Sequence, residues 1–202
     1  MKVLVIGGVG FFGSHLVALL EAGGHDVFIG RRSASNDPRV VSIDRQGPFD
    51  VLLGAGFDVV VDAAGPFQSA GAPEYGLQRF CIANGISCLD LSDDPHFTQG
   101  ITALDAAARA AGVLVLSGLS SGPALSSAAI ERLSADMDEV ITIETAITPG
   151  NKTDRGVSVV HSILAQIGRK MQIWQGARWR EAYAWGKQRA FTYPNGERRV
   201  GF

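Results

Sequence analysis

The sequence predicts an α/β fold in which a doubly wound parallel sheet is followed by a partial second α/β (α+β) domain. Three observations support this prediction. The chain opens with an apolar run, a glycine-rich turn and a segment of helical periodicity. In all, six short apolar runs alternate with helical or turn segments up to residue 116. Beyond residue 118 this alternation ends, so we expect one domain over residues 1–118 and a second over residues 119–202.

The opening stretch, residues 2–20, has the sequence KVLVIGGVGFFGSHLVALL. Its apolar run predicts a strand buried on both faces, and the apolar residues after the glycines recur at helical spacing. The glycines fit two registers, Gly7-x-x-Gly10-x-x-Gly13 and Gly8-x-Gly10-x-x-Gly13. Glycine lets the backbone turn tightly beside a pyrophosphate, and the helix N-terminus offers unpaired N–H groups to the phosphates. The stretch predicts a dinucleotide-binding (Rossmann) turn; the alternative is a plain glycine turn in another α/β protein.

The second strand, predicted at residues 26–30, is followed by Arg31 and Arg32. In a dinucleotide-binding fold an acidic residue here binds the ribose 2′-hydroxyl of NAD, whereas arginine accommodates the 2′-phosphate of NADP. The two arginines therefore favour NADP over NAD, the alternative being a solvated arginine turn. The third strand, predicted at residues 40–44, places Asp44 near the adenine edge.

The remaining elements of the first domain follow in order. We expect a short helix at 50–56, a strand at 58–64, a helix at 74–84, a strand at 86–91, a polar loop at 92–97, a helix at 98–111 and a strand at 113–116. The carboxyl ends of the later strands are expected to lie beside the nicotinamide, across the switch point of the sheet. In full, the residues predicted to bind the coenzyme are Gly7, Gly10, Phe11, Phe12, Gly13, Arg31, Arg32, Asp44, Ala63, Ala64, Gly65, Pro66, Phe67, Ser92 and Ser117.

The candidate catalytic residues are Asp93 and His96, in the polar loop after the fifth strand. Hydride transfer to a small-molecule substrate is assisted by a proton donor, and these two side chains are the best placed in the sequence. The alternative for each is a loop-capping or solvated residue.

Composition excludes several classes of partner. The formal net charge of −2 gives no electrostatic footprint for nucleic acid, and no apolar stretch is long enough to span a membrane. Cys81 and Cys88 stand in no Cys-x-x-Cys motif, and the four histidines are scattered. We therefore expect buried free thiols in a reducing, cytoplasmic protein with no metal site.

In the second domain the apolar and helical segments no longer alternate regularly. We expect a helix at 123–133, a strand at 139–147 and a helical face at 157–167. The stretches 171–185 and 191–202 follow, the second with a hairpin turn at Pro194–Gly196. The three tryptophans are predicted to fill a small core; the alternatives are a substrate wall or a subunit interface. The sequence stops within an apparent strand, which suggests a truncated domain or one completed by a partner chain.

Several stretches together resemble the saccharopine dehydrogenase and saccharopine reductase-like oxidoreductases. They are the opening residues 3–20, VVVDAAGPF at 59–67, YGLQRFCIANGISCLDLSDDPHF at 75–97, SSGP at 120–123 and RGVSVVHSILAQIG at 155–168. The resemblance implies an NAD(P)-binding domain, a second domain for substrate and dimer contacts, a homodimer, and NADP(H)-linked hydride transfer, often at a carbon–nitrogen bond. The chain departs from the family at Asp93-Asp94, where Gly-Glu is common.

Two other functions remain open. The opening VIGGVGFFGSHL also suits a short-chain dehydrogenase or epimerase, and Tyr183 and Lys187 form a Tyr-x-x-x-Lys pair. That pair should lie on the helix after the fifth strand, however, and here it follows the predicted end of the sheet. The last alternative is an NADP-binding sensor or scaffold that carries out no reaction.

Overall fold

The computed structural model describes residues 1–67, 75–147, 152, 156–186, 188–193 and 196–201. The chain forms two compact units, residues 1–125 (unit 1) and 126–202 (unit 2). Each unit is described by itself below.

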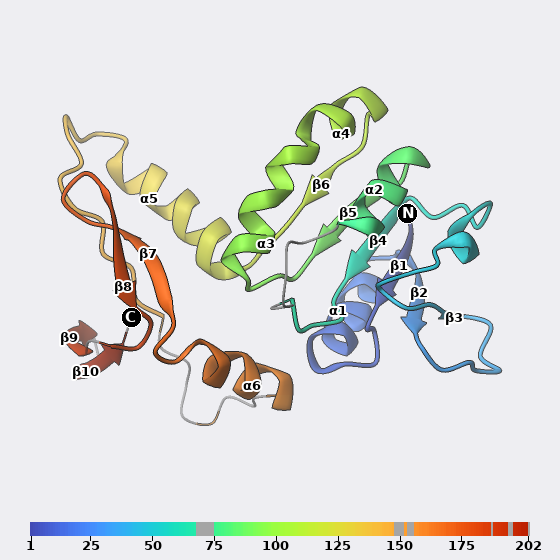
Figure 1. Ribbon diagram of the computed structural model, residues 1–202, viewed down its shortest axis with the longest axis horizontal. Coiled ribbons are helices and arrows are strands. Elements are labelled where there is room, and N and C mark those ends of the chain that lie inside the picture. Colours follow the sequence, from blue (N-terminus) through green and yellow to red (C-terminus); the bar gives the residue numbers. More distant parts are fainter. Residues whose placement is uncertain (68–74, 148–151, 153–155, 187, 194–195, 202) are drawn as a thin grey trace. The chain divides into compact units, whose positions relative to one another are not determined.

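Unit 1 is built on a six-stranded parallel sheet (Figure 1). Its strands are β1 (Lys2–Ile6), β2 (Asp26–Arg31), β3 (Val40–Ser42), β4 (Val59–Asp62), β5 (Ser87–Asp90) and β6 (Val115–Leu116), in the spatial order β3-β2-β1-β4-β5-β6. Strands β2 and β3 are added on one side of β1, whereas β4, β5 and β6 are added on its other side. The switch point therefore lies between β1 and β4, and the predicted doubly wound α/β fold is confirmed.

The sheet buries a different apolar cluster on each face. On one face Val3 and Val5 of β1 pack with Val17 of helix α1 (Phe11–Ala22). On the other face Leu4 and Ile6 pack beneath helix α2 (Gly76–Ala83) and the short 3-10 helix η1 (Asp50–Leu52). Alternation along β1 thus fills both faces, as the unbroken apolar run predicts.

Both cysteines belong to the second of these clusters and are free and buried, as expected. A hydrogen bond with Cys81, followed by burial, raises the pKa of Cys88 above its ordinary value.

Two predicted boundaries in unit 1 are wrong. The polar loop expected at 92–97 ends early, because Asp94 caps a helix that begins at Pro95. The single helix expected at 98–111 is three consecutive segments, α3 (Pro95–Gly100), η2 (Ile101–Leu104) and α4 (Asp105–Ala111). Proline at the first helical position and an aspartate before it are strong helix-start signals, and here they outweigh the polar composition.

Unit 2 contains helices and two antiparallel hairpins. Unit 1 ends with the short π-helix η3 (Ser121–Leu125), and unit 2 begins with α5 (Ser126–Ser134), which α6 (Val157–Gln166) follows later. Strand β7 (Lys170–Trp174) pairs with β8 (Trp179–Tyr183), and β9 (Gln188–Tyr193) pairs with β10 (Gly196–Gly201). The hairpin residues 194–195 lie outside the described residues.

Two predictions for unit 2 are wrong. The strand expected at 139–147 is not regular structure, and its alternating apolar side chains are exposed, Ile141 by 87%. No neighbouring strand pairs with it within the described residues, and alternation alone cannot supply backbone hydrogen-bond partners. The tryptophans do not fill a core: Trp174, Trp179 and Trp185 are all exposed, with Trp174 and Trp179 in edge contact across the β7–β8 hairpin.

No helix among the described residues is long and apolar enough to cross a membrane.

Candidate functional site

The glycine turn between β1 and α1 faces the end of β4. Gly7 has a φ of +79°, and its N–H donates to the carbonyl of Gly30 over 2.8 Å. A Cβ at Gly7 would lie 2.9 Å from the backbone of Ala64. A Cβ at Gly13 would overlap the carbonyl oxygen of Gly7. Since Gly8 lacks a positive φ, the conformation favours the register Gly7-x-x-Gly10-x-x-Gly13.

Helix α1 begins without a side-chain cap. Gly10 is its N-cap residue, and no acidic residue stands in the first turn. The predicted contact residues Phe11 and Phe12 form this turn, their rings 5.2 Å apart and Phe12 exposed. A helix end of this kind presents N–H groups and the positive end of the helix dipole to an anion.

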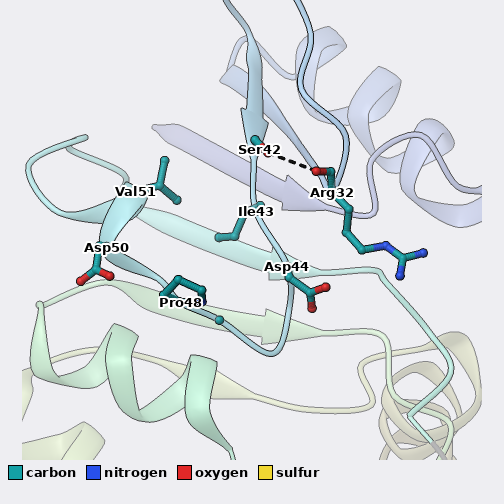
Figure 2. Close-up of a pocket in the computed structure, with 8 residues that line it drawn as sticks. Arg32, Ser42, Ile43, Asp44, Pro48, Asp50 and Val51 are labelled. Carbon is teal, nitrogen blue, oxygen red and sulfur yellow. Dashed lines mark hydrogen bonds between the residues drawn. The ribbon is translucent and has the colours of Figure 1, made fainter.

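A pocket of about 320 Å³ lies where β2 and β3 end (Figure 2). It is lined by Arg32, Ser42, Ile43, Asp44, Gly47, Pro48, Asp50 and Val51. In Figure 2 the Arg32 guanidinium and the Asp44 carboxylate lie at one end of the pocket, and Asp50 and Val51 lie at the other. The pocket thus combines apolar side chains with charged groups at both ends.

The two predicted arginines differ in setting. Arg31 is the last residue of β2 and is half-buried, whereas Arg32 is exposed and lines the pocket. In the part of the chain that the structure describes, neither guanidinium forms an ion pair with a carboxylate. Both therefore keep their charge available to an anionic group.

The segment after β4 contains five of the predicted coenzyme contacts, residues 63–67. The N–H of Ala63 donates to Ile6, and the N–H of Ala64 donates to the Asp62 carboxylate. Gly65 and Pro66 are exposed, but Phe67 is 5% exposed and packs against Phe97. Phe67 is therefore part of the hydrophobic core, whereas residues 63–66 are at least partly accessible to a ligand.

Asp62, the last residue of β4, was not predicted as a site residue. It is 1% exposed and pairs with Arg45, whose Nη2 lies 2.9 Å from the Asp62 Oδ2 atom. Burial raises the pKa of Asp62 above its ordinary value, and the charge of Arg45 opposes that rise.

Asp90 has the equivalent place at the end of β5 and was also missed. Its Oδ1 atom accepts hydrogen bonds from the hydroxyl of Ser117 (2.7 Å), the N–H of Gly118 (3.1 Å) and the N–H of Ser92 (3.0 Å). The predicted contacts Ser92 and Ser117 therefore meet at one buried carboxylate. A single aspartate ending an apolar parallel strand, as in VVVD and SCLD, is the sequence signal that could have identified both positions.

The candidate proton donors lie beside this region. Asp93 and His96 are both exposed, Asp93 before helix α3 and His96 within it. Neither lines the pocket at β2 and β3. It is Asp94 that accepts the capping hydrogen bond, from the N–H of Phe97. Within the described residues no group of three metal-ligating side chains comes together.

Of the Tyr-x-x-x-Lys pair, the structure describes Tyr183, which is not on a helix. Tyr183 is the last residue of strand β8, and Lys187 lies outside the described residues.

Comparison with known proteins gives a partial family match. The model of the NAD-dependent epimerase/dehydratase family matches residues 3–79, which include β1 to β4 and the glycine turn. This match favours the epimerase alternative over the saccharopine reductase resemblance. No curated protein sequence matches the chain.

Three solved structures are similar to part of the chain. A UDP-galactose 4-epimerase aligns at 23% identity over 45% of this chain and 37% of its own, with a TM-score of 0.35. MoeE5, in complex with UDP-glucuronic acid and NAD, aligns at 23% identity over 45% of this chain and 36% of its own, with a TM-score of 0.34. The UDP-N-acetylglucosamine 4-epimerase from Bacillus cereus aligns at 17% identity over 58% of each chain, with a TM-score of 0.42. The chain thus spans well under two thirds of the length of each.

Proposed function

We propose that unit 1 binds a nicotinamide dinucleotide, preferentially NADP(H), and that the protein is an NAD(P)-dependent oxidoreductase acting on a small molecule. The observation that carries the proposal is the close approach of Gly7 and Gly13 to neighbouring backbone at the switch point. A Cβ at either position would clash with that backbone, so glycine is what allows the tight turn that brings the N-terminus of α1 to the switch point, as a dinucleotide-binding turn requires. The residues present therefore fit the coenzyme.

Each half of the coenzyme has a matching part of the site. The pocket after β2 and β3 would hold the adenosine, with Arg31 and Arg32 on the 2′-phosphate and Asp44 near the adenine edge. Ala63, Ala64 and Gly65 would lie beside the nicotinamide half, where small side chains leave room for a ring. When bound, the nicotinamide supplies or accepts the hydride, while the protein orients it.

The substrate and the proton donor are assigned from other observations. The saccharopine reductase resemblance favours reaction at a carbon–nitrogen bond. Asp93 and His96 are exposed near the ends of β5 and β6 and could give a proton to a substrate held there. The family match over residues 3–79 supports a second candidate, an epimerase or dehydratase that uses its coenzyme without net consumption.

Calorimetric titration with NADPH and NADH tests the proposal. We expect NADPH to bind more tightly by about tenfold or more, since charge-assisted hydrogen bonds contribute about 1.5–3 kcal/mol. The double variant Arg31→Ala/Arg32→Ala should lose this preference. Arg39→Ala is the matched control, because Arg39 is exposed and already pairs with Glu21 and Asp37. Binding of neither coenzyme would overturn the proposal.

Activity assays then separate the candidates. Consumption of NADPH with imine or keto substrates supports the oxidoreductase, and interconversion of sugar nucleotides without consumption supports the epimerase. Tight NADPH binding with neither activity supports a sensor.

A further inference from the structure

Arg45 connects the two loops that flank the proposed coenzyme site. It lies two residues beyond the adenosine-pocket residue Ile43, in the loop after β3. Its guanidinium reaches the end of β4, where Nε donates to the Asp62 Oδ2 atom over 3.0 Å and Nη1 donates to the carbonyl of Pro66 over 3.0 Å. The same group lies 4.3 Å from the centre of the Phe67 ring. One side chain thus contacts a buried carboxylate, a backbone carbonyl and an aromatic face.

These contacts use properties that only arginine combines. The planar guanidinium presents donors in several directions, stays charged, and stacks on aromatic rings. The Arg45 side chain is 24% exposed and that of Asp62 is 2% exposed, so water screens the pair only weakly. Asp90, on the neighbouring strand, adds negative charge near Asp62 and makes a compensating cation more important.

Arg45 also restrains the segment that follows β4. The hydrogen bonds to Ile6 and Asp62 hold Ala63 and Ala64. Among the described residues, the hydrogen bond to the carbonyl of Pro66 comes from Arg45, and Gly65 and Pro66 are both exposed. The guanidinium of Arg45 and the burial of Phe67 therefore both hold the segment past Ala64.

We propose that Arg45 is a positioning residue that holds segment 63–67 in place for the nicotinamide half of the coenzyme and ties it to the adenosine pocket. This role rests on the proposed function. It is distinct from that of Arg31 and Arg32, which are assigned to the phosphate itself. Arg45 acts through the backbone of Pro66 and the ring of Phe67, and it makes no contact with the coenzyme. Loss of Arg45 should weaken binding of the whole dinucleotide and spare binding of its adenosine half.

The test compares two ligands on the full chain by calorimetry: NADPH, and adenosine 2′,5′-bisphosphate as the adenosine half. Arg45→Met keeps an unbranched apolar stem and removes the charge and the donors. Its affinity for NADPH should fall about tenfold or more, while its affinity for the bisphosphate stays within about twofold of the wild type. Arg45→Lys keeps a charge but cannot reach Asp62 and Pro66 together, so its loss should be intermediate. Arg39→Met is the control and should change neither affinity.

The outcomes distinguish this inference from the proposed function. A wild-type chain that binds neither ligand contradicts the proposed function. A wild-type chain that binds both, with the Arg45 variants unchanged, contradicts the role of Arg45 alone. A parallel loss of both ligands in Arg45→Lys indicates a general structural role and also overturns it. If Arg45→Met does not fold, as judged by circular dichroism, Arg45→Lys decides between these results.

Discussion

At the scale of single residues, Gly7 and Gly24 share a left-handed backbone and differ in their surroundings. Their φ angles are +79° and +77°. A Cβ at Gly7 would lie 2.9 Å from the backbone of Ala64, whereas a Cβ at Gly24 would meet no atom within 4 Å. The pair therefore separates the cost of a positive φ from the cost of a clash between the glycine turn and the backbone after β4.

Gly24→Ala should lower the free energy of unfolding by about 1–2 kcal/mol, because it adds only the strain of a left-handed alanine. Gly7→Ala should lower it further and should also weaken NADPH binding by at least about tenfold, because the turn must move away from Ala64. Urea unfolding and NADPH titration measure the two effects. Equal losses of stability in both variants, with NADPH binding retained, would contradict the assigned role of Gly7.

The buried Asp62 gives a pH dependence with a definite sign. Burial is the largest influence on its pKa and raises it above the ordinary 3.8, against the opposing charge of Arg45. Between 3.8 and the raised pKa the folded chain holds a proton that the unfolded chain has released. The contribution of Asp62 to stability is therefore present at low pH and is lost as pH rises through the folded pKa.

We expect the wild type to gain stability relative to Asp62→Asn as pH falls from about 7 toward 4. The gain in the free energy of unfolding should be about 1.4 kcal/mol for each factor of ten by which the proton affinity of Asp62 is higher in the folded chain than in the unfolded chain. The asparagine variant removes the titrating group, and the other carboxylates are common to both proteins. Urea unfolding at several pH values measures the difference. A wild type that loses stability relative to Asp62→Asn on acidification would mean that Arg45 outweighs burial.

Sequence patterns indicate those candidate-site residues that lie close to one another along the chain. The glycine turn, the two arginines at the end of β2 and the position of Asp44 in the pocket after β3 all follow from local order along the first strands and helix. The Arg45–Asp62 pair joins residues 17 apart across two strands, and local patterns do not show which side chains meet there. The same holds for Asp90, whose partners Ser117 and Gly118 arrive from the next strand.

At the scale of elements, a hydrogen bond joins helix α3 to the residue that precedes helix α2. The hydroxyl of Tyr75, which precedes α2, donates to the carbonyl of Phe97 over 2.7 Å. A Cβ at Gly100 would overlap that hydroxyl. The backbone of Gly100 is helical and would accept any residue. It is the Tyr75 hydroxyl that leaves no room for a side chain at this position.

Gly100→Ala should lower the free energy of unfolding by about 1–3 kcal/mol through overpacking against Tyr75. In a Tyr75→Phe background the clash disappears, so the two changes should be less than additive, with a coupling of about 0.5–3 kcal/mol. Gly76→Ala is the control, because its Cβ would meet only Phe49, at 3.6 Å. A double-mutant cycle by urea unfolding measures the coupling, and strict additivity would contradict the proposed clash.

Elements were predictable where periodicity and burial agreed. Strands β2 and β4 lie within two residues of their predicted ends, and β1 forms at the predicted apolar run, because each is an apolar run with packing on both faces. The segment 139–147 has a strand's alternation but no partner strand in the described chain, and a strand is defined by pairing as much as by pattern. Periodicity alone could not make that distinction.

At the scale of the whole molecule, the two units differ in how much apolar surface they bury. Among the described residues, the buried apolar clusters lie in unit 1. In unit 2 the described residues include a single buried hydrophobic residue, Ala184, and helix α5 has none. Apolar burial is the main stabilising term in folding, so the units should differ in local stability.

Native-state hydrogen exchange on the isolated chain at low concentration tests this difference. Backbone amides of β1 and β4 lie between paired strands beneath two apolar clusters, so they should exchange only through opening of the whole unit. Amides of α5 and α6 should exchange about a hundredfold faster or more, because none of the buried apolar clusters among the described residues includes a residue of these helices. Raising the protein concentration is the internal control: slower exchange confined to unit 2 would show that association covers its exposed apolar residues. Protection of α5 and α6 equal to that of β1 at every concentration would contradict the difference in stability between the units.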